Sequence, residues 1–420
     1  MTERNEFLEK LKESGLLKKA SEIKGPYREQ PYPIEKLFPE GEYRETPYKR
    51  VFRIRREFGP EERTGDVMIR DFFNFRDNFP FLFSVLGKNE KLKSFQIDKL
   101  LFFDVESTGL TSGAGNMVFL IGIGYFSDDE KFITEQYFIE DFTNEKGLLY
   151  ILKEIFSRKR HLVSFNGKSF DFYVLKNRFV LSRRFDFTLD NLLHFDLLHS
   201  SRRLWKDRIR EFSLGCLEKD ILHFTRSNED IPGYLVPEYY KDYLKTRNAQ
   251  ILEKVFYHNL MDVRSMLALL TVQLKNLHQI LQGVYPENIN YMNIARLLKT
   301  LDKELYVALL RHDCLVRPEN RSASLKLIYL FHKSERETRK MAELLHQMLD
   351  ECGEFDYYIY RELSIYYERH EKKANEARRT LEDARGQMER LARAVYRNFS
   401  REMEDVSKRL KRLEKKCSKN

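Results

Sequence analysis

An apolar run that ends in two acidic residues constrains this chain more than any other feature. Residues 100–103 are Leu-Leu-Phe-Phe, and Asp104 and Glu106 follow on either side of Val105. Such a run predicts a buried strand, in which side chains alternate between faces, so both acids are expected on one face. Two adjacent carboxylates repel each other, and a divalent cation with oxygen ligands is the usual way to offset this. The alternative is a solvent-facing acidic pair at a strand edge.

A second acidic position follows another short apolar segment. Residues 162–165 predict a strand, and Asn-Gly-Lys-Ser-Phe-Asp occupies 166–171, before a helical stretch over 172–180. Ser169 is expected to cap this helix, with Asp171 in its first turn. Asp171 would then either serve the helix dipole alone or join the first two acids in one site.

A third acidic position lies within a long helical pattern. Asp262 is preceded by Tyr257 and His258, and apolar residues continue the pattern to Leu274. Residues four apart share a helical face, so His258 should lie beside Asp262. Taken alone, this motif is explained by an ordinary hydrogen-bonded pair. Three acidic motifs in this order favour a shared site.

Together the three motifs resemble those of the DEDD-type 3′–5′ exonucleases, which have a ribonuclease-H-like fold. Segments 195–199, 202–205 and 213–218 add a closer similarity to the YprB-like bacterial proteins, over residues 35–275. The resemblance implies an α/β fold with a mixed sheet flanked by helices. It also implies hydrolysis of DNA or RNA to nucleoside 5′-monophosphates. Two Mg²⁺ or Mn²⁺ ions would assist this reaction, held by Asp104, Glu106, Asp171 and Asp262.

The general base is the position where the chain departs from that family pattern. The family places His five residues or Tyr four residues before the last Asp, whereas here Tyr257 is five before Asp262 and His258 is four before. On a continuous helix His258 shares the face of Asp262 and Tyr257 points away. His258 is therefore the predicted base, because an imidazole with a pKa of about 6.5 can accept a proton near neutral pH. Tyr257 stays the alternative.

Basic residues near the motifs predict a nucleic-acid partner. The formal net charge is +9, which favours a polyanion. Basic residues also surround the only tryptophan, a pattern suited to single-stranded nucleic acid, although a core position for Trp205 is the other interpretation. Whether the partner is DNA or RNA stays open. The predicted contacts are Asn166, Lys168, Arg202, Arg203 and Trp205.

Composition bounds the setting of the chain. The first twenty residues are rich in charge, so no signal peptide is expected. The longest apolar run, 117–126, is too short to span a bilayer. The cysteines are scattered, which argues against a zinc site and fits a reducing compartment. We expect a cytoplasmic protein that does not contact a membrane.

The layout predicts three regions. Residues 1–98 would hold a charged helix, a linker and short strands, including an exposed strand over 49–56 with a cationic polar face. Residues 99–275 would form the ribonuclease-H-like domain. Residues 276–420 would be all-helical, with patterns that recur at 35 to 38 residues, close to the tetratricopeptide period of 34. A plain helical bundle is equally compatible, and either could recruit a protein partner.

The C-terminal tail is strongly basic. From residue 388 onward it holds 11 Lys and Arg against 5 Asp and Glu, a net charge of +6. Val406, Leu410 and Leu413 keep a helical apolar stripe, which predicts an amphipathic helix. Its polar side is either an ordinary solvated face or a segment that steers nucleic acid.

Two function classes remain open from the sequence. The first is a metal-dependent exonuclease, with an endonuclease as an enzymatic variant. The second is a nucleic-acid-binding scaffold with weak or no catalysis that recruits partners through its helical region.

Overall fold

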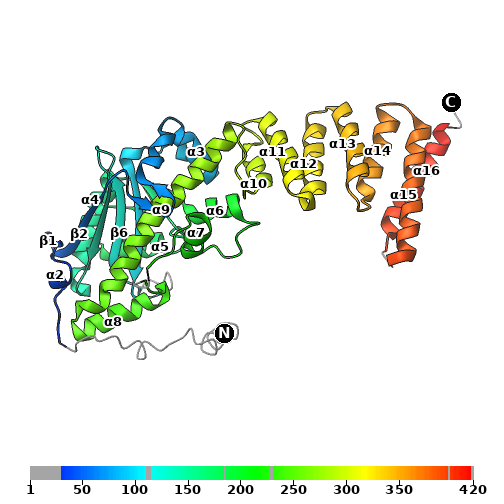
Figure 1. Ribbon diagram of the computed structural model, residues 1–420. Helices are drawn as coiled ribbons and strands as arrows, with labels where there is room; N and C mark the ends of the chain where they lie inside the picture. The colour runs from blue at the N-terminus through cyan, green and yellow to red at the C-terminus, as the bar shows by residue number, and fades with distance from the viewer. Residues whose placement is uncertain (1–29, 110–114, 184, 228–229, 396–397, 418–420) are drawn as a thin grey trace. The chain divides into compact units, whose positions relative to one another are not determined.

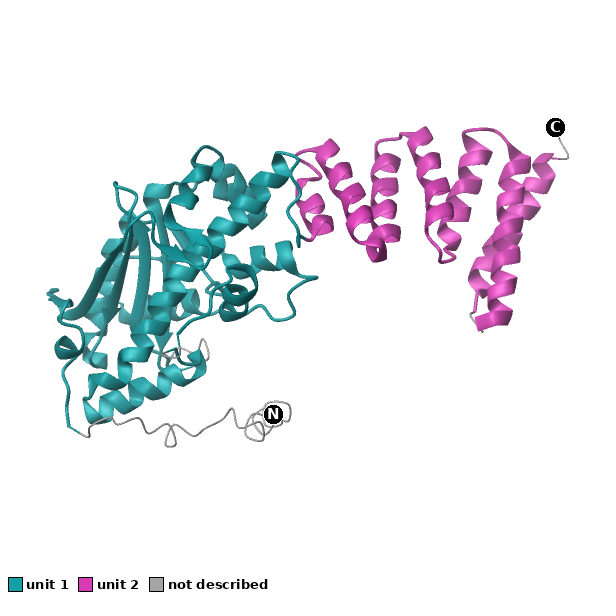
Figure 2. Cartoon of the chain, in the orientation of Figure 1, with its two compact units in different colours: residues 1–289 teal, residues 290–420 magenta. Residues whose placement is uncertain are grey.

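The chain divides into two compact units, residues 1–289 and residues 290–420 (Figure 2). The boundaries predicted after residues 98 and 275 stay predictions, and residue 275 lies within a helix of the first unit. Most of the charged helix predicted near the N-terminus lies outside the described residues. The computed structural model describes residues 30–109, 115–183, 185–227, 230–395 and 398–417.

A seven-stranded mixed sheet forms the centre of the first unit (Figure 1). The strand order is β1-β2-β7-β6-β5-β8-β9. β5 pairs in parallel with β8, and β8 with β9, whereas the other pairs are antiparallel. The strands are β1 (Glu42–Arg44), β2 (Val51–Phe58), β5 (Leu100–Ser107), β6 (Val118–Phe126), β7 (Phe132–Phe138), β8 (His161–Ser164) and β9 (Leu193–Asp196). β3 (Arg63–Thr64) and β4 (Val67–Met68) form a separate small hairpin.

β5 lies between β6 and β8, so neighbouring strands flank it on both sides. Its four apolar residues, 100–103, are buried. The strand continues through Asp104 and Glu106, because backbone pairing with β6 continues until the register shifts after Glu106. The first two acids therefore lie on a strand in the middle of the sheet, where pairing on both sides holds the backbone rigid.

Helices cover both faces of the sheet. On one face α9 (Glu253–Leu281) packs across β5, β6 and β7 (Figure 1). On the other, α4 (Glu145–Arg158) and α5 (Asp171–Ser182) share a core with Leu101, Phe103 and Val105. The remaining helices of this unit are α2 (Ile34–Leu37), α3 (Phe79–Gly87), α6 (Leu197–Trp205), α7 (Leu214–Ile221) and α8 (Val236–Thr246), with short 3₁₀ turns between them.

A glycine sets the approach of α9 to the sheet. A Cβ on Gly122 of β6 would lie 2.3 Å from Oδ1 of Asn259 on α9, well inside van der Waals contact. Asn259 is fully buried, and its Oδ1 accepts a hydrogen bond from Nε2 of Gln136 on β7 at 3.0 Å. The amide thus fills the space that the missing side chain leaves.

Two strands of the sheet differ from the sequence prediction. Residues 49–56 were expected to form an exposed strand with a cationic face, but β2 belongs to the sheet, with Val51, Phe52 and Ile54 buried. Its cations have partners: Arg53 lies 3.2 Å from Glu135, and Arg56 donates to Gln136 at 3.0 Å. β9 was missed, because four residues are too few to establish a periodicity.

The second unit is helical in its described residues, as predicted, and each helix packs on the next (Figure 2). A relationship to tetratricopeptide repeats stays a prediction. Val406, Leu410 and Leu413 are buried, which confirms the amphipathic C-terminal helix. No helix in the described part of the chain is long and apolar enough to cross a membrane. The helices are α10 (Tyr291–Leu298), α11 (Lys303–Val316), α12 (Arg321–Ser334), α13 (Thr338–Glu351), α14 (Tyr357–Arg369), α15 (Ala374–Val395) and α16 (Ser400–Cys417).

Candidate active site

Asp104 and Glu106 lie on the face of β5 that α9 covers. Nδ2 of Asn259 donates to Oδ2 of Asp104 at 2.8 Å and approaches its carbonyl oxygen at 3.3 Å. Glu106 is 9% exposed, so it is not the solvent-facing acid of the alternative interpretation. The strand alternation thus places both carboxylates under the same helix.

Asp171 is brought to this site by the loop that follows β8. The Asp196 carboxylate at the end of β9 accepts from the backbone N–H of Asn166 at 2.9 Å and of Lys168 at 3.1 Å, which fixes the loop. Asp171 then begins α5 and is 7% exposed. The prediction that Ser169 caps α5 is wrong: Phe170 occupies the cap position, and no side chain caps the helix there.

α9 supplies the third acidic motif. Nε2 of His258 lies 3.6 Å from Oδ2 of Asp262, so the two share a helical face as predicted. Nδ1 of His258 lies 2.7 Å from Oδ1 of Asp230, which orients the ring. The hydroxyl of Tyr257 instead accepts from the backbone N–H of Ser227 at 3.2 Å. The geometry therefore favours His258 over Tyr257 as the residue that can act beside Asp262.

Arg226 is the residue of this site that the sequence analysis missed. Its side chain is 9% exposed and pairs with Glu218 of α7, at 2.6 Å from Nη2 to Oε1. Nη1 lies 3.3 Å from Oδ2 of Asp230, and Nη2 donates to Oδ1 of Asp262. These partners lie 8, 4 and 36 residues away in the chain. A single Arg in a loop carries no periodic signal, so nothing in the sequence pattern selects it.

The carboxylates perturb one another electrostatically. Burial and the charge of Asp262 raise the pKa of Asp104 to about 7. Burial, with the charge of Asp104, also raises the pKa of Glu106 well above its usual range. Burial raises the pKa of Asp171 too, reinforced by Asp104 and Glu106. These mutual effects show that residues from β5, α5 and α9 form one electrostatic cluster.

His258 responds to the same cluster in the opposite direction. Burial alone would lower its pKa, but the charge of Asp262 and the hydrogen bond with Asp230 raise the pKa of His258 to about 10. The ring is then protonated near neutral pH. Acting as a base requires that the surrounding negative charge be reduced first.

The donor set suits hard divalent cations. Asp104, Glu106, Asp171 and Asp262 offer only carboxylate oxygens, the ligands that Mg²⁺ and Mn²⁺ prefer. Within the described residues the first three form no ion pair, and the nearby charges of His258 and Arg226 offset the repulsion at Asp104 and Glu106 only in part, because the pKa of both groups stays raised. However, no three His, Cys, Asp or Glu residues of the described chain already surround a single metal position. The chemistry fits, whereas the side chains would have to reorient to bind an ion.

The predicted nucleic-acid contacts are placed differently from one another. Trp205 is 2% exposed and therefore belongs to the core, so the prediction that it stacks on bases is wrong. Nη1 of Arg203 donates to the carbonyl of Leu86 at 2.5 Å, which gives this side chain a structural role. Asn166, Lys168 and Arg202 are exposed and stay candidate contacts.

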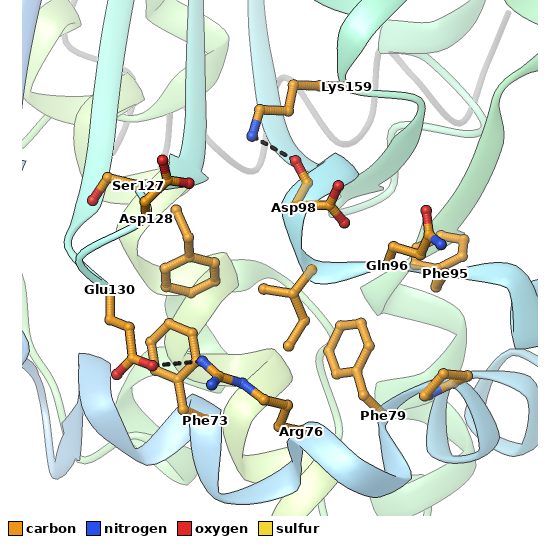
Figure 3. A pocket seen from close by; sticks show the side chains of 13 residues that line it. Phe73, Arg76, Phe79, Phe95, Gln96, Asp98, Ser127, Asp128, Glu130 and Lys159 are labelled. Atoms are coloured by element: carbon orange, nitrogen blue, oxygen red, sulfur yellow. Dashed lines mark hydrogen bonds and ion pairs between the residues drawn. The ribbon is translucent and has the colours of Figure 1, made fainter.

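A groove of about 790 Å³ opens beside the cluster and is large enough to hold a nucleotide-sized ligand. His258 and Asp262 from α9 line it, together with Arg226 and the start of α7. A separate cavity of about 490 Å³ lies at the other end of β5, where Phe73, Phe126 and Ile97 line it and the rim is charged (Figure 3). It contains none of the motif carboxylates, so the groove is the candidate substrate site.

Comparisons with known proteins agree with this architecture. Residues 101–273 match the family described as the RNase_H superfamily. The uncharacterized protein YprB of Bacillus subtilis (strain 168) is 39% identical over 187 residues, which is 44% of this chain and 44% of that relative. The match therefore spans less than half of the length of this relative.

A likeness to a solved structure is weaker. The family B DNA polymerase from the hyperthermophilic archaeon Pyrobaculum calidifontis is 17% identical, with a TM-score of 0.32, over 51% of this chain and 29% of that one. A TM-score this low carries no conclusion. The mixed sheet, its covering helices and the family match instead show that residues 101–273 have a ribonuclease-H-like fold.

Proposed function

We propose that this chain is a two-metal-dependent 3′–5′ exonuclease that hydrolyses phosphodiester bonds of DNA or RNA to nucleoside 5′-monophosphates. The burial of Asp104, Glu106 and Asp171 beside Asp262 carries the proposal. Uncompensated buried carboxylates are unfavourable unless a cation neutralises them. Perturbed carboxyl pKa values next to a groove are also typical of functional sites. The 3′–5′ polarity rests on the motif resemblance.

Each residue has a distinct proposed role. Asp104, Glu106, Asp171 and Asp262 would hold two Mg²⁺ or Mn²⁺ ions, which when bound stabilise negative charge on the attacking and leaving oxygens. Nε2 of His258 would accept a proton from the attacking water. Asp230 keeps the ring oriented by its contact with Nδ1. Neutralising the carboxylates would lower the pKa of His258 toward the range of a useful base.

Release of nucleotides tests the proposal directly. Single-stranded DNA and RNA labelled at the 3′ or the 5′ end would be incubated with Mn²⁺, Mg²⁺ or EDTA. We expect metal-dependent shortening from the 3′ end, lost in Asp104→Ala. Asp98→Ala, an exposed acid at the opposite end of β5, is the matched control and should retain activity. Cleavage that survives Asp104→Ala or EDTA would contradict the proposal.

A nucleic-acid-binding scaffold is the second candidate. It is favoured by the raised pKa of His258, since a protonated imidazole is not a base, and by the helical second unit as a place for a protein partner. In the same assay, nucleic-acid binding without cleavage by any metal, substrate or labelled end would support the scaffold and reject the exonuclease.

A further inference from the structure

Arg226 makes a contact that the proposed chemistry must disturb. Asp262 is a proposed metal ligand, and its Oδ1 accepts a hydrogen bond from Nη2 of Arg226. Within the described residues, Asp262 is the one member of the four-carboxylate set that pairs with an arginine. A guanidinium and a divalent cation carry like charge and seek the same oxygen lone pairs. They therefore compete for Asp262.

The same arginine has anchors that do not depend on Asp262. Nε of Arg226 lies 2.8 Å from Oε2 of Glu218, whose side chain is 2% exposed. Nη1 lies 3.3 Å from Oδ2 of Asp230. Arg226 can give up its contact with Asp262 and still be paired with two carboxylates, which limits the energetic cost of leaving it. A buried guanidinium without such anchors would be strongly destabilising.

We propose that Arg226 is a positioning residue that acts as a counter-ion latch on Asp262: it holds this carboxylate until a divalent cation displaces it onto Glu218 and Asp230. This inference rests on the proposed function, because it requires that Asp262 bind a cation. The latch also implies that the Arg226 guanidinium lowers the affinity of the site for its cation, because it competes for Asp262. The carboxylates of Asp104 and Glu106, which make no such pair in the described residues, are free of that competition.

The latch predicts an effect on metal affinity that a purely structural role would not produce. Arg226→Gln removes the competing charge, so Mn²⁺ should bind about tenfold more tightly, a change of roughly 1.4 kcal/mol. Arg226→Lys keeps the charge but loses the planar fork that bridges several carboxylates, and its affinity should lie between those of Arg226→Gln and the wild type. If Arg226 merely held α7 and α9 in place, both variants would bind Mn²⁺ more weakly.

The measurement is a Mn²⁺ titration of the full chain without nucleic acid, with free Mn²⁺ followed by electron paramagnetic resonance. Arg264→Gln is the matched control. It removes another largely buried arginine of the same region, one that donates to the carbonyl of Arg63. Its Mn²⁺ affinity should stay within about twofold of the wild type. Circular dichroism in EDTA would establish that each variant is folded.

The outcomes separate the latch from the proposed function. Asp104→Asn should weaken Mn²⁺ binding if the carboxylates hold metal at all; no effect of this variant would contradict the two-metal proposal and the latch with it. If Asp104→Asn weakens binding while Arg226→Gln leaves affinity unchanged or lower, the latch alone is overturned. Tighter binding in Arg226→Gln but not in Arg264→Gln supports it.

Discussion

Asp104 is held by an amide and not by a cation. Asn259 donates to it at 2.8 Å, while burial and the charge of Asp262 raise its pKa to about 7. The hydrogen bond fixes the carboxylate in place but does not neutralise it. The free energy of unfolding of the first unit should therefore depend on pH and on divalent cations.

The first residue-scale prediction concerns pH and stability in EDTA. The pKa of Asp104 in the folded state lies above that of an unfolded aspartate, so its stabilising contribution is full below about pH 4 and is lost as pH rises through about 7. Asp104→Asn removes this titration. Relative to the wild type, the variant should gain on the order of 2–4 kcal/mol at pH 8. Near pH 4 the difference should vanish.

Thermal unfolding in EDTA between pH 4 and pH 8 would measure this difference. Asp98→Asn, which changes an exposed acid just before β5, should show no such pH-dependent gain. A gain for Asp104→Asn that is the same at every pH would show that packing, and not charge, is responsible.

The second residue-scale prediction distinguishes His258 from Tyr257. His258→Ala should lower kcat by about 10²–10⁴-fold, the usual contribution of a general base. Tyr257→Phe should change kcat only a few-fold, because its hydroxyl accepts from the Ser227 N–H and does not reach Asp262. Single-turnover cleavage of a labelled oligonucleotide would compare them. A larger loss in Tyr257→Phe would reverse the assignment.

At the scale of elements, the position of α9 on the sheet controls the site. α9 carries His258 and Asp262 on one side and Asn259, which reaches Asp104, on another. Its distance from β6 is set at Gly122, where Asn259 occupies the space of the missing Cβ. A change at this contact would move two catalytic candidates relative to Asp104 at once.

Gly122→Ala tests this contact. The added methyl group would meet Oδ1 of Asn259 at 2.3 Å, and displacing a buried amide should lower the free energy of unfolding by about 1–3 kcal/mol. Gly59→Ala is the control, since nothing lies within 4 Å of its Cβ position. Urea unfolding would compare both variants with the wild type. Equal stability of Gly122→Ala and Gly59→Ala would show that α9 can move away from β6 at little cost in free energy.

The sequence predicted the elements whose signals are local. β5 was predicted because a continuous apolar run marks a buried strand, and the His258–Asp262 spacing marks a helical face. β2 was misjudged because the acid that pairs with Arg53, Glu135, lies 82 residues away. For Trp205 the sequence left base stacking and a core position both open, because flanking arginines do not show which way a ring points, and burial decides for the core.

Arg226 could not be predicted for a similar reason. Arg226 lies in the loop after α7 and contacts Glu218 of α7 and Asp262 of α9, and the contact with α9 forms only in the folded chain. The same limit applies to the pKa of His258, which was expected to lie near 6.5 but is raised to about 10 by its acidic neighbours. Residue types predict the chemistry of a site, whereas their environment sets its electrostatics.

At the scale of the whole molecule, positive charge is concentrated toward the C-terminus. The tail from residue 388 carries a net charge of +6 out of a total of +9. On α16, Lys411 and Lys415 are exposed and have no ion-pair partner in the described residues, whereas Arg412 and Lys416 both pair with Glu368. Lys411 and Lys415 are therefore available to a polyanion.

Charge reversal of these two lysines tests the steering role. Lys411→Glu with Lys415→Glu should weaken binding of single-stranded nucleic acid and reduce the dependence of log K on log salt by about 1.4, for two lost contacts. A dinucleotide substrate, too short to reach a second surface, should be hydrolysed at the wild-type rate. Fluorescence anisotropy at several salt concentrations would measure the slope.

The control reverses two exposed basic residues of α13, Arg339 and Lys340, which already pair with Glu343 and Glu337. These lie in the same unit and produce the same change in net charge. If they reduce binding as much as the α16 pair does, net charge alone acts, and no particular surface of the tail is involved.

The meeting of Gly122, Asn259 and Asp104 also limits how such a chain can change over generations. Position 259 needs an amide that donates to Asp104 and accepts from Gln136, and position 122 must leave room for it. A side chain at position 122 would occupy the space of the Asn259 amide. A smaller residue at position 259 would leave that space free but would lose the donor to Asp104. A substitution at one position therefore cannot compensate for a substitution at the other. Both positions should therefore drift more slowly than their neighbours, and a lineage should lose them together only after it has lost Asp104.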